Sequence, residues 1–382
     1  MLALAIALYV HVPFCIKKCG YCSFASIPIE GGDAAGYLKA LWSETGLRAG
    51  MLLPEEKRVD TIYVGGGTPT CLTGDELAGI MERIFSCFEV AGDAEITVEA
   101  NPGTVDFKKL AILKKAGFNR LSLGVQACRE DLLKTLGRIH SFSAAVSTLA
   151  EAREAGFQNI NVDLIFGIPG QTLEQWEECL EGITGLGPEH LSAYGLQVEE
   201  GTPLFDRIGR GELFPCDEDL EADMYLHLMQ HMKSRGYVHY EISNFALPGR
   251  ECRHNLCYWR NKSYLGLGPA AHSNLRGRRF SNHAGPGVYA EMLMEGHFPE
   301  CWEERIDTRT EMSETAFLGL RLLEGLDIGE FRKRFGRDIL EVYGREINRL
   351  TVLGLVEMAD GRIRLTPRGL MMGNVVFAEF IQ

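Results

Sequence analysis

The most informative residues are three cysteines that lie within a stretch of eight residues, at Cys15, Cys19 and Cys22. Thiolates bind soft and borderline metals, and iron–sulfur clusters take cysteine ligands at close spacing. A [4Fe–4S] cluster normally has four cysteine ligands, but residue 24, where a C-x-C extension would supply the fourth, is Phe24. The spacing therefore predicts a cluster held by three thiolates, with one iron left open to bind a small molecule.

Two other interpretations of these cysteines are weaker. Structural zinc sites usually pair C-x2-C units with distant partners, and the candidate partner segment, residues 252–257, lies far away and has a poor spacing. Three unrelated core cysteines are a further alternative, but Lys17 and Lys18 place the segment in a polar loop. We therefore favour a cluster.

Two further polar segments follow predicted strands. The run from Val64 to Thr70 contains three consecutive glycines, which permit positive φ and a close approach of the backbone to a ligand. Alone, this run is equally consistent with a tight strand-to-helix turn. Glu99 ends a later strand, where its carboxylate could accept hydrogen bonds from ribose hydroxyls or an amine, or could be a solvated strand end.

These residues sit at the ends of a series of predicted β/α units. The predicted strands are short, apolar and rich in β-branched or aromatic residues: 3–12, 61–64, 95–99, 120–125, 161–166 and 190–197. Predicted helices include 106–116, 144–155 and 172–182, and Gly117 and Gly156 end the first two. Six such units predict an α/β fold with parallel strands, either an open doubly wound sheet or a partial (β/α)6 TIM-like barrel. In both, chemistry gathers at the C-terminal ends of the strands.

The composition is that of a soluble globular protein, with 382 residues, 46% of them apolar and 24% charged. This length predicts a main domain, 1–300, and a small C-terminal domain, 301–382. Predicted helices at 314–323, 328–335 and 338–353 and a strand at 362–365 make the C-terminal domain similar to a winged helix. From residue 305 on, basic and acidic residues are equal in number, which favours a helical cap or docking module over a DNA reader. The net charge of −13 also argues against nucleic-acid binding.

The sequence favours a cytoplasmic location. It has no apolar run long enough for a membrane span. The apolar start, residues 1–12, has no preceding Lys or Arg and no clean cleavage site, so we expect a buried first strand rather than a signal peptide. The eleven cysteines are odd in number and unevenly spread, which predicts reduced thiols rather than a disulfide framework.

The cysteine motif resembles that of the radical S-adenosylmethionine (SAM) family. The resemblance includes Cys-x3-Cys-x2-Cys and the preceding segment from Tyr9 to Phe14. In that family the amino and carboxylate groups of SAM chelate the open iron, and electron transfer cleaves a C–S bond to give a deoxyadenosyl radical. The resemblance therefore implies a radical SAM barrel and two cofactors, a [4Fe–4S] cluster and SAM.

Further motifs are similar to the HemN/HemW branch of that family. They lie at residues 120–126, 136–140 and 161–170. By resemblance, SAM contacts fall on Tyr9, Tyr21, Gly66, Gly67, Thr68, Glu99, Gln126, Arg138 and Asp163. Arg138 suits a SAM carboxylate because its guanidinium is a planar, multiple donor, whereas Gln126 and Asp163 suit ribose hydroxyls.

Within this branch the chain resembles HemW-type haem chaperones more than HemN decarboxylases. HemN carries a fourth cysteine at the position of Phe24 and an N-terminal extension, whereas only eight residues precede Tyr9 here. The H-N-x-x-Y-W signature of the chaperones is present and implies haem contacts from His254, Asn255, Tyr258 and Trp259. Histidine can ligate haem iron and aromatic rings can pack on a porphyrin, with Cys257 as an alternative ligand. From chemistry alone, such a histidine is more often a hydrogen-bonded structural residue.

The function that the resemblance implies is that of a haem chaperone that binds SAM and a cluster on the three cysteines. It would take haem as cargo and pass it to an acceptor haemoprotein such as a respiratory enzyme, with peripheral membrane contact only through that acceptor. The alternative is an oxygen-independent coproporphyrinogen III dehydrogenase, in which SAM yields a radical that starts an oxidative decarboxylation. A radical SAM enzyme acting on another tetrapyrrole is a third possibility, so catalytic turnover stays open.

Overall fold

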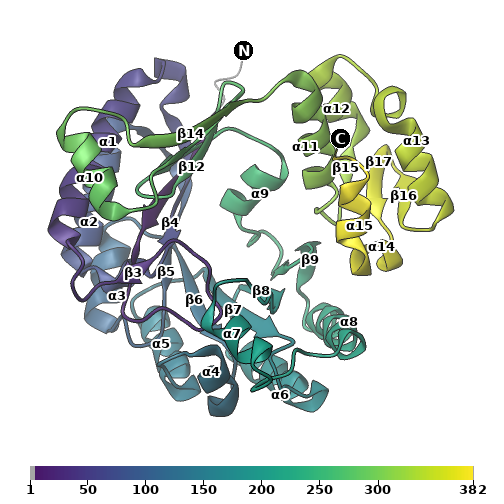
Figure 1. Cartoon of the computed structure of the whole chain (residues 1–382), viewed down its shortest axis with the longest axis horizontal. Coiled ribbons are helices and arrows are strands. Elements are labelled where there is room, and N and C mark those ends of the chain that lie inside the picture. The colour runs from purple at the N-terminus through teal and green to yellow at the C-terminus, as the bar shows by residue number, and fades with distance from the viewer. Residues whose placement is uncertain (1–4, 382) are drawn as a thin grey trace.

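The main body is an open barrel whose parallel strands neighbour one another in sequence order (Figure 1). The computed structural model describes residues 5–381. These strands carry mostly buried residues, as expected for a parallel sheet covered by helices. They are β1 (Ile6–Val12), β4 (Arg58–Gly66), β5 (Glu89–Ala100), β6 (Arg120–Gln126), β7 (Ile160–Phe166) and β8 (His190–Gly195). The predicted α/β fold with parallel strands is thus confirmed, in the form of a partial barrel.

Additional strands extend the sheet at both edges. On one side β11 pairs in parallel with β1 and is followed by an antiparallel meander, and on the other side two short antiparallel strands pair with β8. The added strands are β11 (Tyr264–Leu267), β12 (His272–Leu275), β13 (Arg278–Asn282), β14 (Glu300–Arg305), β10 (Asn244–Ala246) and β9 (Val238–Glu241). In the described part of the chain the sheet ends at β14 and β9, so the barrel stays open.

Helices cover the outer face of the barrel sheet (Figure 1). They are α1 (Ala34–Met51), α2 (Gly74–Cys87), α3 (Phe107–Lys115), α4 (Glu130–Leu136), α5 (Phe142–Glu154), α6 (Leu173–Gly185), α8 (Glu218–Ser234) and α10 (Pro286–Met294). The short helix α7 (Pro203–Gly209) lies instead at the rim of the barrel, where the backbone N–H of Leu204 donates to the Gly20 carbonyl. As predicted, Gly117 and Gly156 follow α3 and α5 with φ of 103° and 93°. Within residues 5–381, no helix is long and apolar enough to cross a bilayer.

Strand ends differ from the prediction where the chain meets the cavity described below. The predicted first strand begins at Ile6, and residues 3 and 4 lie outside the described residues. The predicted sixth strand, 190–197, ends at Gly195, because Leu196 and Gln197 turn to line that cavity. Short elements complete the connections: β2 (Phe14–Cys15), β3 (Ile27–Pro28), η1 (Pro54–Glu56) and η2 (Pro69–Cys71).

The interior of the barrel is polar, whereas the layer between sheet and helices is apolar. Alternate residues of β6 face inward, so that Arg120, Ser122 and Gln126 share one face with Gly124. In the strand register Thr97 of β5 lies opposite Arg120, and Asn161 of β7 lies opposite Ser122. This alternation places a set of hydrogen-bonding side chains inside the barrel.

The C-terminal segment has a hydrophobic core of its own. Its elements are α11 (Thr308–Gly319), β15 (Leu326–Asp327), α12 (Ile328–Phe335), α13 (Ile339–Val352), β16 (Val356–Ala359), β17 (Arg362–Leu365), α14 (Pro367–Met371) and α15 (Gly373–Ala378). The helix predicted at 314–323 starts earlier, because the Asp307 carboxylate caps α11 at the backbone N–H of Thr310. The boundary predicted at residue 300 falls at the start of β14, which still belongs to the barrel sheet.

The short helix α9 (Arg253–Trp259) joins these two parts and lies between the barrel strands and α11 (Figure 1). The Arg321 guanidinium carbon lies 4.3 Å from the centre of the Trp259 ring. The backbone N–H of Leu323 donates to the Tyr240 carbonyl at 3.0 Å. The C-terminal segment is thereby fixed against α9 and the β9 edge of the barrel.

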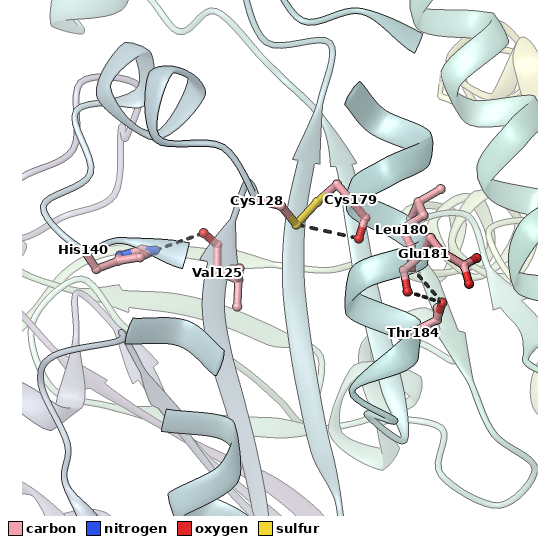
Figure 2. Close-up of a disulfide and its surroundings, with 7 residues drawn as sticks. All are labelled: Val125, Cys128, His140, Cys179, Leu180, Glu181 and Thr184. Atoms are coloured by element: carbon pink, nitrogen blue, oxygen red, sulfur yellow. Dashed lines mark hydrogen bonds between the residues drawn. A yellow bond between two sulfur atoms is a disulfide. The ribbon is translucent and has the colours of Figure 1, made fainter. Parts of the chain in front are cut away.

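One disulfide corrects a prediction. Cys128 and Cys179 are bonded, so the expectation of reduced thiols is wrong for this pair (Figure 2). Cys128 follows β6 and Cys179 lies on the buried face of α6, with Cα atoms 5.3 Å apart. A separation of 51 residues in sequence hid this proximity, which only the barrel topology creates. Cys15, Cys19 and Cys22 are free.

Candidate functional site

A cavity of about 420 Å³ lies inside the barrel and opens at the C-terminal ends of the strands. Its lining contains all three predicted cluster cysteines, Cys15, Cys19 and Cys22. Of the predicted SAM residues it contains Tyr21, Gly66, Gly67, Thr68, Glu99, Gln126, Arg138 and Asp163, and of the predicted haem residues it contains Asn255. Tyr9, His254, Tyr258 and Trp259 are not part of the lining.

The cysteine loop is fixed to the barrel rim by neighbouring segments. The backbone N–H of Gly20 donates to the Leu136 carbonyl at 3.0 Å, and the Gly20 carbonyl accepts from the Leu204 N–H at 2.8 Å. The Arg138 guanidinium donates to the Cys19 sulfur at 3.2 Å. Burial raises the pKa of Cys22, and the nearby Cys19 and Cys15 thiols add to that shift. The three sulfurs are therefore partly exposed and face one end of the cavity.

This arrangement fits a [4Fe–4S] cluster. Within residues 5–381, no three Cys, His, Asp or Glu side chains converge as ligands of a single metal ion do. In a cubane cluster each thiolate binds a different iron atom, so the cysteine sulfurs are spread around the cluster and do not converge on a single position. Three free thiols on one loop, at the open end of a polar cavity, supply that donor set.

The glycines after β4 let the backbone form part of the cavity wall. Gly66 has a φ of 111°, and a Cβ there would lie 2.6 Å from the His11 ring. A Cβ on Gly67 would lie 2.5 Å from the Phe14 carbonyl oxygen. Side chains are therefore excluded at both positions, and the peptide groups come within reach of a ligand.

Two half-buried carboxyl groups, Glu99 beside the glycines and Asp163 on β7, also line the cavity. Glu99 accepts hydrogen bonds from the Tyr63 hydroxyl at 2.8 Å and from the Gly66 N–H at 3.2 Å. Asp163 accepts from Ser122 at 3.0 Å and from Asn161 at 2.7 Å. Burial raises the pKa of Glu99 to about 7, and it also raises the pKa of Asp163. Glu99 can therefore hold or release a proton near neutral pH, and both groups can accept hydrogen bonds from hydroxyl or amine groups.

A chain of hydrogen bonds connects this wall to the cysteine loop. The Asn101 amide donates to the Thr68 hydroxyl oxygen at 2.7 Å, and its carbonyl oxygen accepts from Arg138. Arg138 also donates to the Gly124 carbonyl at 2.8 Å. The guanidinium is thus held between the loop and the strand ends, where it can meet a carboxylate. Gln126 lines the same region and has a left-handed φ of 70°.

His254 lies in the core beside the cavity rather than in it. It is 1% exposed, its Nδ1 pairs with the Thr61 hydroxyl at 2.9 Å and its Nε2 pairs with the Tyr258 hydroxyl at 2.9 Å. Burial lowers the pKa of His254 to about 3, and the positive charge of Arg120 adds to this. Both ring nitrogens are therefore engaged, as expected for a structural histidine, and neither is free to ligate haem iron in this structure.

The other predicted residues outside the cavity also have structural contacts. The Tyr9 hydroxyl pairs with His11 Nδ1 at 3.0 Å, and its ring stacks on Tyr63. The Tyr258 ring lies edge-on to Tyr264, and Trp259 packs under Arg321. These aromatic side chains hold β1, α9 and the C-terminal segment in place.

Sequence reasoning did not single out Tyr63, Asn101 and Arg120, which all line the cavity. The alternation of inward-facing and outward-facing residues along the strands could have identified them. Residues 120, 122, 124 and 126 have the period of two that places them on one face with Gln126. Tyr63 lies two residues before Gly65, so the same period of two places its side chain on the face of β4 from which the glycine run begins.

Comparison with known proteins agrees with this geometry. Residues 9–183 match the radical SAM superfamily, and residues 306–372 match the HemN C-terminal domain. Coproporphyrinogen III oxidase (HemN) from Escherichia coli, a radical SAM enzyme, has a similar structure with a TM-score of 0.87 at 25% identity, covering 99% of this chain and 90% of that chain.

Full-length relatives are more similar in sequence. The heme chaperone HemW of Bacillus subtilis (strain 168) is 38% identical over 98% of this chain and 98% of its own length. HemW of Mycobacterium tuberculosis (H37Rv) is 36% identical over 96% of this chain and 93% of its own. Radical S-adenosyl methionine domain-containing protein 1, mitochondrial, from Bos taurus is 32% identical over 95% and 84%. The chain belongs to the HemW family of the radical SAM superfamily, and this membership implies a [4Fe–4S] cluster and SAM as cofactors.

Proposed function

We propose that this protein is a haem chaperone that binds haem and passes it to acceptor haemoproteins. The observation that carries the proposal is similarity along the whole chain, at 35–38% identity, to proteins named heme chaperone HemW. HemN is less similar in sequence, and Phe24 stands where the resemblance to HemN calls for a fourth cysteine. Phe24 is 64% exposed and lines the cavity, so an apolar ring is presented to a ligand there.

The cofactor roles of individual residues are part of this proposal. Cys15, Cys19 and Cys22 would hold the cluster. When both cofactors are bound, the cluster and SAM would supply one-electron chemistry. Around them, Arg138 donates to the sulfur of Cys19 and has a fixed position from which to bind a carboxylate. SAM would lie against Tyr21, Gly66, Gly67, Thr68, Glu99, Gln126 and Asp163, which line the cavity. Tyr9 would act through Tyr63, on which its ring stacks.

The carboxyl groups would bind the polar parts of SAM. Because burial brings the pKa of Glu99 to about 7, Glu99 is a good acceptor for hydroxyl or ammonium protons above that pH and can donate one below it. Asp163 is held in one orientation by Ser122 and Asn161. The cavity wall therefore needs little rearrangement to bind a ligand with a ribose and an amino acid group.

Oxygen-independent coproporphyrinogen III oxidation is the second candidate. It is favoured by the TM-score of 0.87 with HemN, which extends over nearly the whole chain. The same cavity and cysteine loop would then serve an oxidative decarboxylation.

An anaerobic experiment separates the two candidates. Protein purified without oxygen is assayed for iron and sulfide, titrated with haem, and then incubated with SAM, a reductant and coproporphyrinogen III. A chaperone binds haem stably and does not decarboxylate the porphyrinogen. Stoichiometric release of CO₂ would overturn the chaperone proposal in favour of the second candidate.

The acceptor and the location are also proposals. The C-terminal segment, fixed to α9 by Arg321, offers a docking surface for an acceptor next to the barrel. We keep the predicted cytoplasmic location, with membrane contact only through the acceptor.

A further inference from the structure

Arg120 is a buried cation at the inner end of the cavity. It is the first residue of β6, its side chain is 1% exposed, and it lines the cavity together with Ser122. The predicted SAM residues Gln126 and Arg138 lie at the other end of β6 or beyond it. Arg120 is therefore separated from the cysteine loop by the length of the strand.

The guanidinium of Arg120 has no hydrogen-bonding partner. Its Nε is buried without one, and it forms no hydrogen bond or ion pair with any residue between 5 and 381. Burying an unpaired charge is costly, so a buried arginine normally has a hydrogen-bonded counter-ion. Such a group facing a cavity indicates a ligand that supplies the missing anion.

The nearest carboxylate interactions do not fill that need. Glu95 acts on Arg120 through space, but its oxygens accept hydrogen bonds from the backbone N–H groups of Arg253 and His254 at 3.1 and 3.0 Å. The Cys252 thiol also donates to it, at 3.5 Å. Glu95 thus fixes the start of α9, and the donors of Arg120 are left free.

Two further polar groups without partners are relevant to this site. Asn255 lines the cavity from α9, and its side-chain amide makes no hydrogen bond with the residues that the structure describes. Thr97 is opposite Arg120 in the strand register and fully buried, and its hydroxyl has no hydrogen-bond partner among residues 5–381. The cavity lining thus contains a cation and an amide that are both unpaired, and a buried unpaired hydroxyl lies behind the cation in the neighbouring strand.

We propose that Arg120, with Asn255, binds a carboxylate arm of the tetrapyrrole ligand. A guanidinium matches a carboxylate with two parallel N–H donors, and the amide can donate to the same oxygens. This inference rests on the proposed function, because haem and coproporphyrinogen both carry propionate side chains.

The test compares ligands with and without free carboxylates on cluster-loaded protein. Haem and haem dimethyl ester are titrated into wild type, Arg120→Met and Arg120→Lys, with SAM affinity and thermal midpoint measured for each protein. Wild type should bind haem about 10- to 100-fold more tightly than the ester, the range of a charge-assisted hydrogen-bonded pair. Arg120→Met should lose this difference while ester binding and SAM affinity stay unchanged, and Arg120→Lys should keep part of it.

Asn255→Ala keeps the test decisive if Arg120 variants fold poorly. It should reduce the preference for haem over its ester several-fold. Equal binding of haem and ester by wild type, or a preference unchanged in Arg120→Met and Asn255→Ala, would overturn the inference while the chaperone function stands. So would a loss of SAM affinity in Arg120→Met without a change in the preference.

A second ligand pair separates this inference from the proposed function. Coproporphyrin III and its tetramethyl ester are titrated in the same way. If the free acid binds through Arg120 while haem does not bind, the carboxylate site stands and the chaperone function falls. If neither acid binds more tightly than its ester, the inference falls.

Discussion

The cavity and the adjacent α9 core differ in how their polar groups are paired. Arg120 and Asn255 line the cavity, and neither side chain has a hydrogen-bond partner among the described residues. Beside the cavity, both nitrogens of His254 are hydrogen-bonded, and the Glu95 carboxylate accepts hydrogen bonds from the start of α9. Buried polar groups in folded proteins are usually paired, so an unpaired group that lines a cavity indicates a ligand contact. Trp259 Nε1, at the end of α9, is also unpaired, but Trp259 does not line the cavity.

The largest effect is expected at the open end of the cavity. Replacing any one of Cys15, Cys19 or Cys22 by serine should abolish cluster binding, because three thiolates are already the minimum set. The loop is partly exposed, so the fold should survive. Iron and sulfide content and the visible spectrum of anaerobically reconstituted protein measure the loss. Cys257→Ala is the matched control and should keep a full cluster.

Neighbouring substitutions on α9 test the contrast directly. His254→Ala removes two buried hydrogen bonds and leaves Thr61 and Tyr258 unpaired, so it should lower the free energy of unfolding by about 3 kcal/mol. Asn255→Ala removes no hydrogen bond within the protein and should change stability by less than about 0.5 kcal/mol. Denaturant unfolding measures both.

Haem titration of His254→Ala completes this test. The Soret position should be unchanged in His254→Ala, provided that the variant is measured below its unfolding transition. A shifted Soret band with normal stability would instead identify His254 as an iron ligand and break the contrast between the two regions.

The disulfide should stabilise the cavity end without forming part of it. Cys128 comes two residues after Gln126, and its bond to Cys179 closes a loop of about 50 residues. Replacing both cysteines by serine should cost about 2 kcal/mol of stability with SAM affinity retained. Wild type in a strong dithiol reductant should melt like the double variant. Equal melting of wild type with and without reductant would show that the bond does not contribute.

The last prediction concerns the pH dependence of stability, where the two regions should behave in opposite ways. The folded state raises the pKa of Glu99 from 4.5 to about 7, so folding takes up a proton and stability falls as pH rises through that window. The folded state lowers the pKa of His254 from 6.5 to about 3, so stability falls as pH drops below 6.5. Relative to wild type, Glu99→Gln should gain stability between pH 4.5 and 7. A flat difference between the two melting profiles would contradict the raised pKa.

The sequence was sufficient for the series of parallel β/α strands and for the three cysteines that the structure places in the cavity lining. Strand periodicity and turn glycines are local signals, and the spacing of Cys15, Cys19 and Cys22 is local as well. Several barrel helices, among them α1, α2, α4 and α8, were not singled out, although a capping box of Thr73 and Glu76 starts α2.

What the sequence could not show depends on contacts between distant segments. The pairing of His254 with Thr61 joins residues 193 positions apart, and this pairing occupies one of the two ring nitrogens that could otherwise ligate iron. Likewise, Arg120 is unpaired because none of the described residues that the fold brings around it accepts a hydrogen bond from its guanidinium. The same reason applies to the Cys128–Cys179 bond, which a count of cysteines cannot reveal.

The short helix α9 has a mechanical consequence. Asn255 and Trp259 are four residues apart, so they lie one turn from each other on the same side of the helix. Asn255 lines the cavity, and Trp259 packs against Arg321 of the C-terminal segment. Helix α9 therefore links the cavity wall to the C-terminal segment as one short rigid body, so that a displacement of the segment would move a residue of the wall.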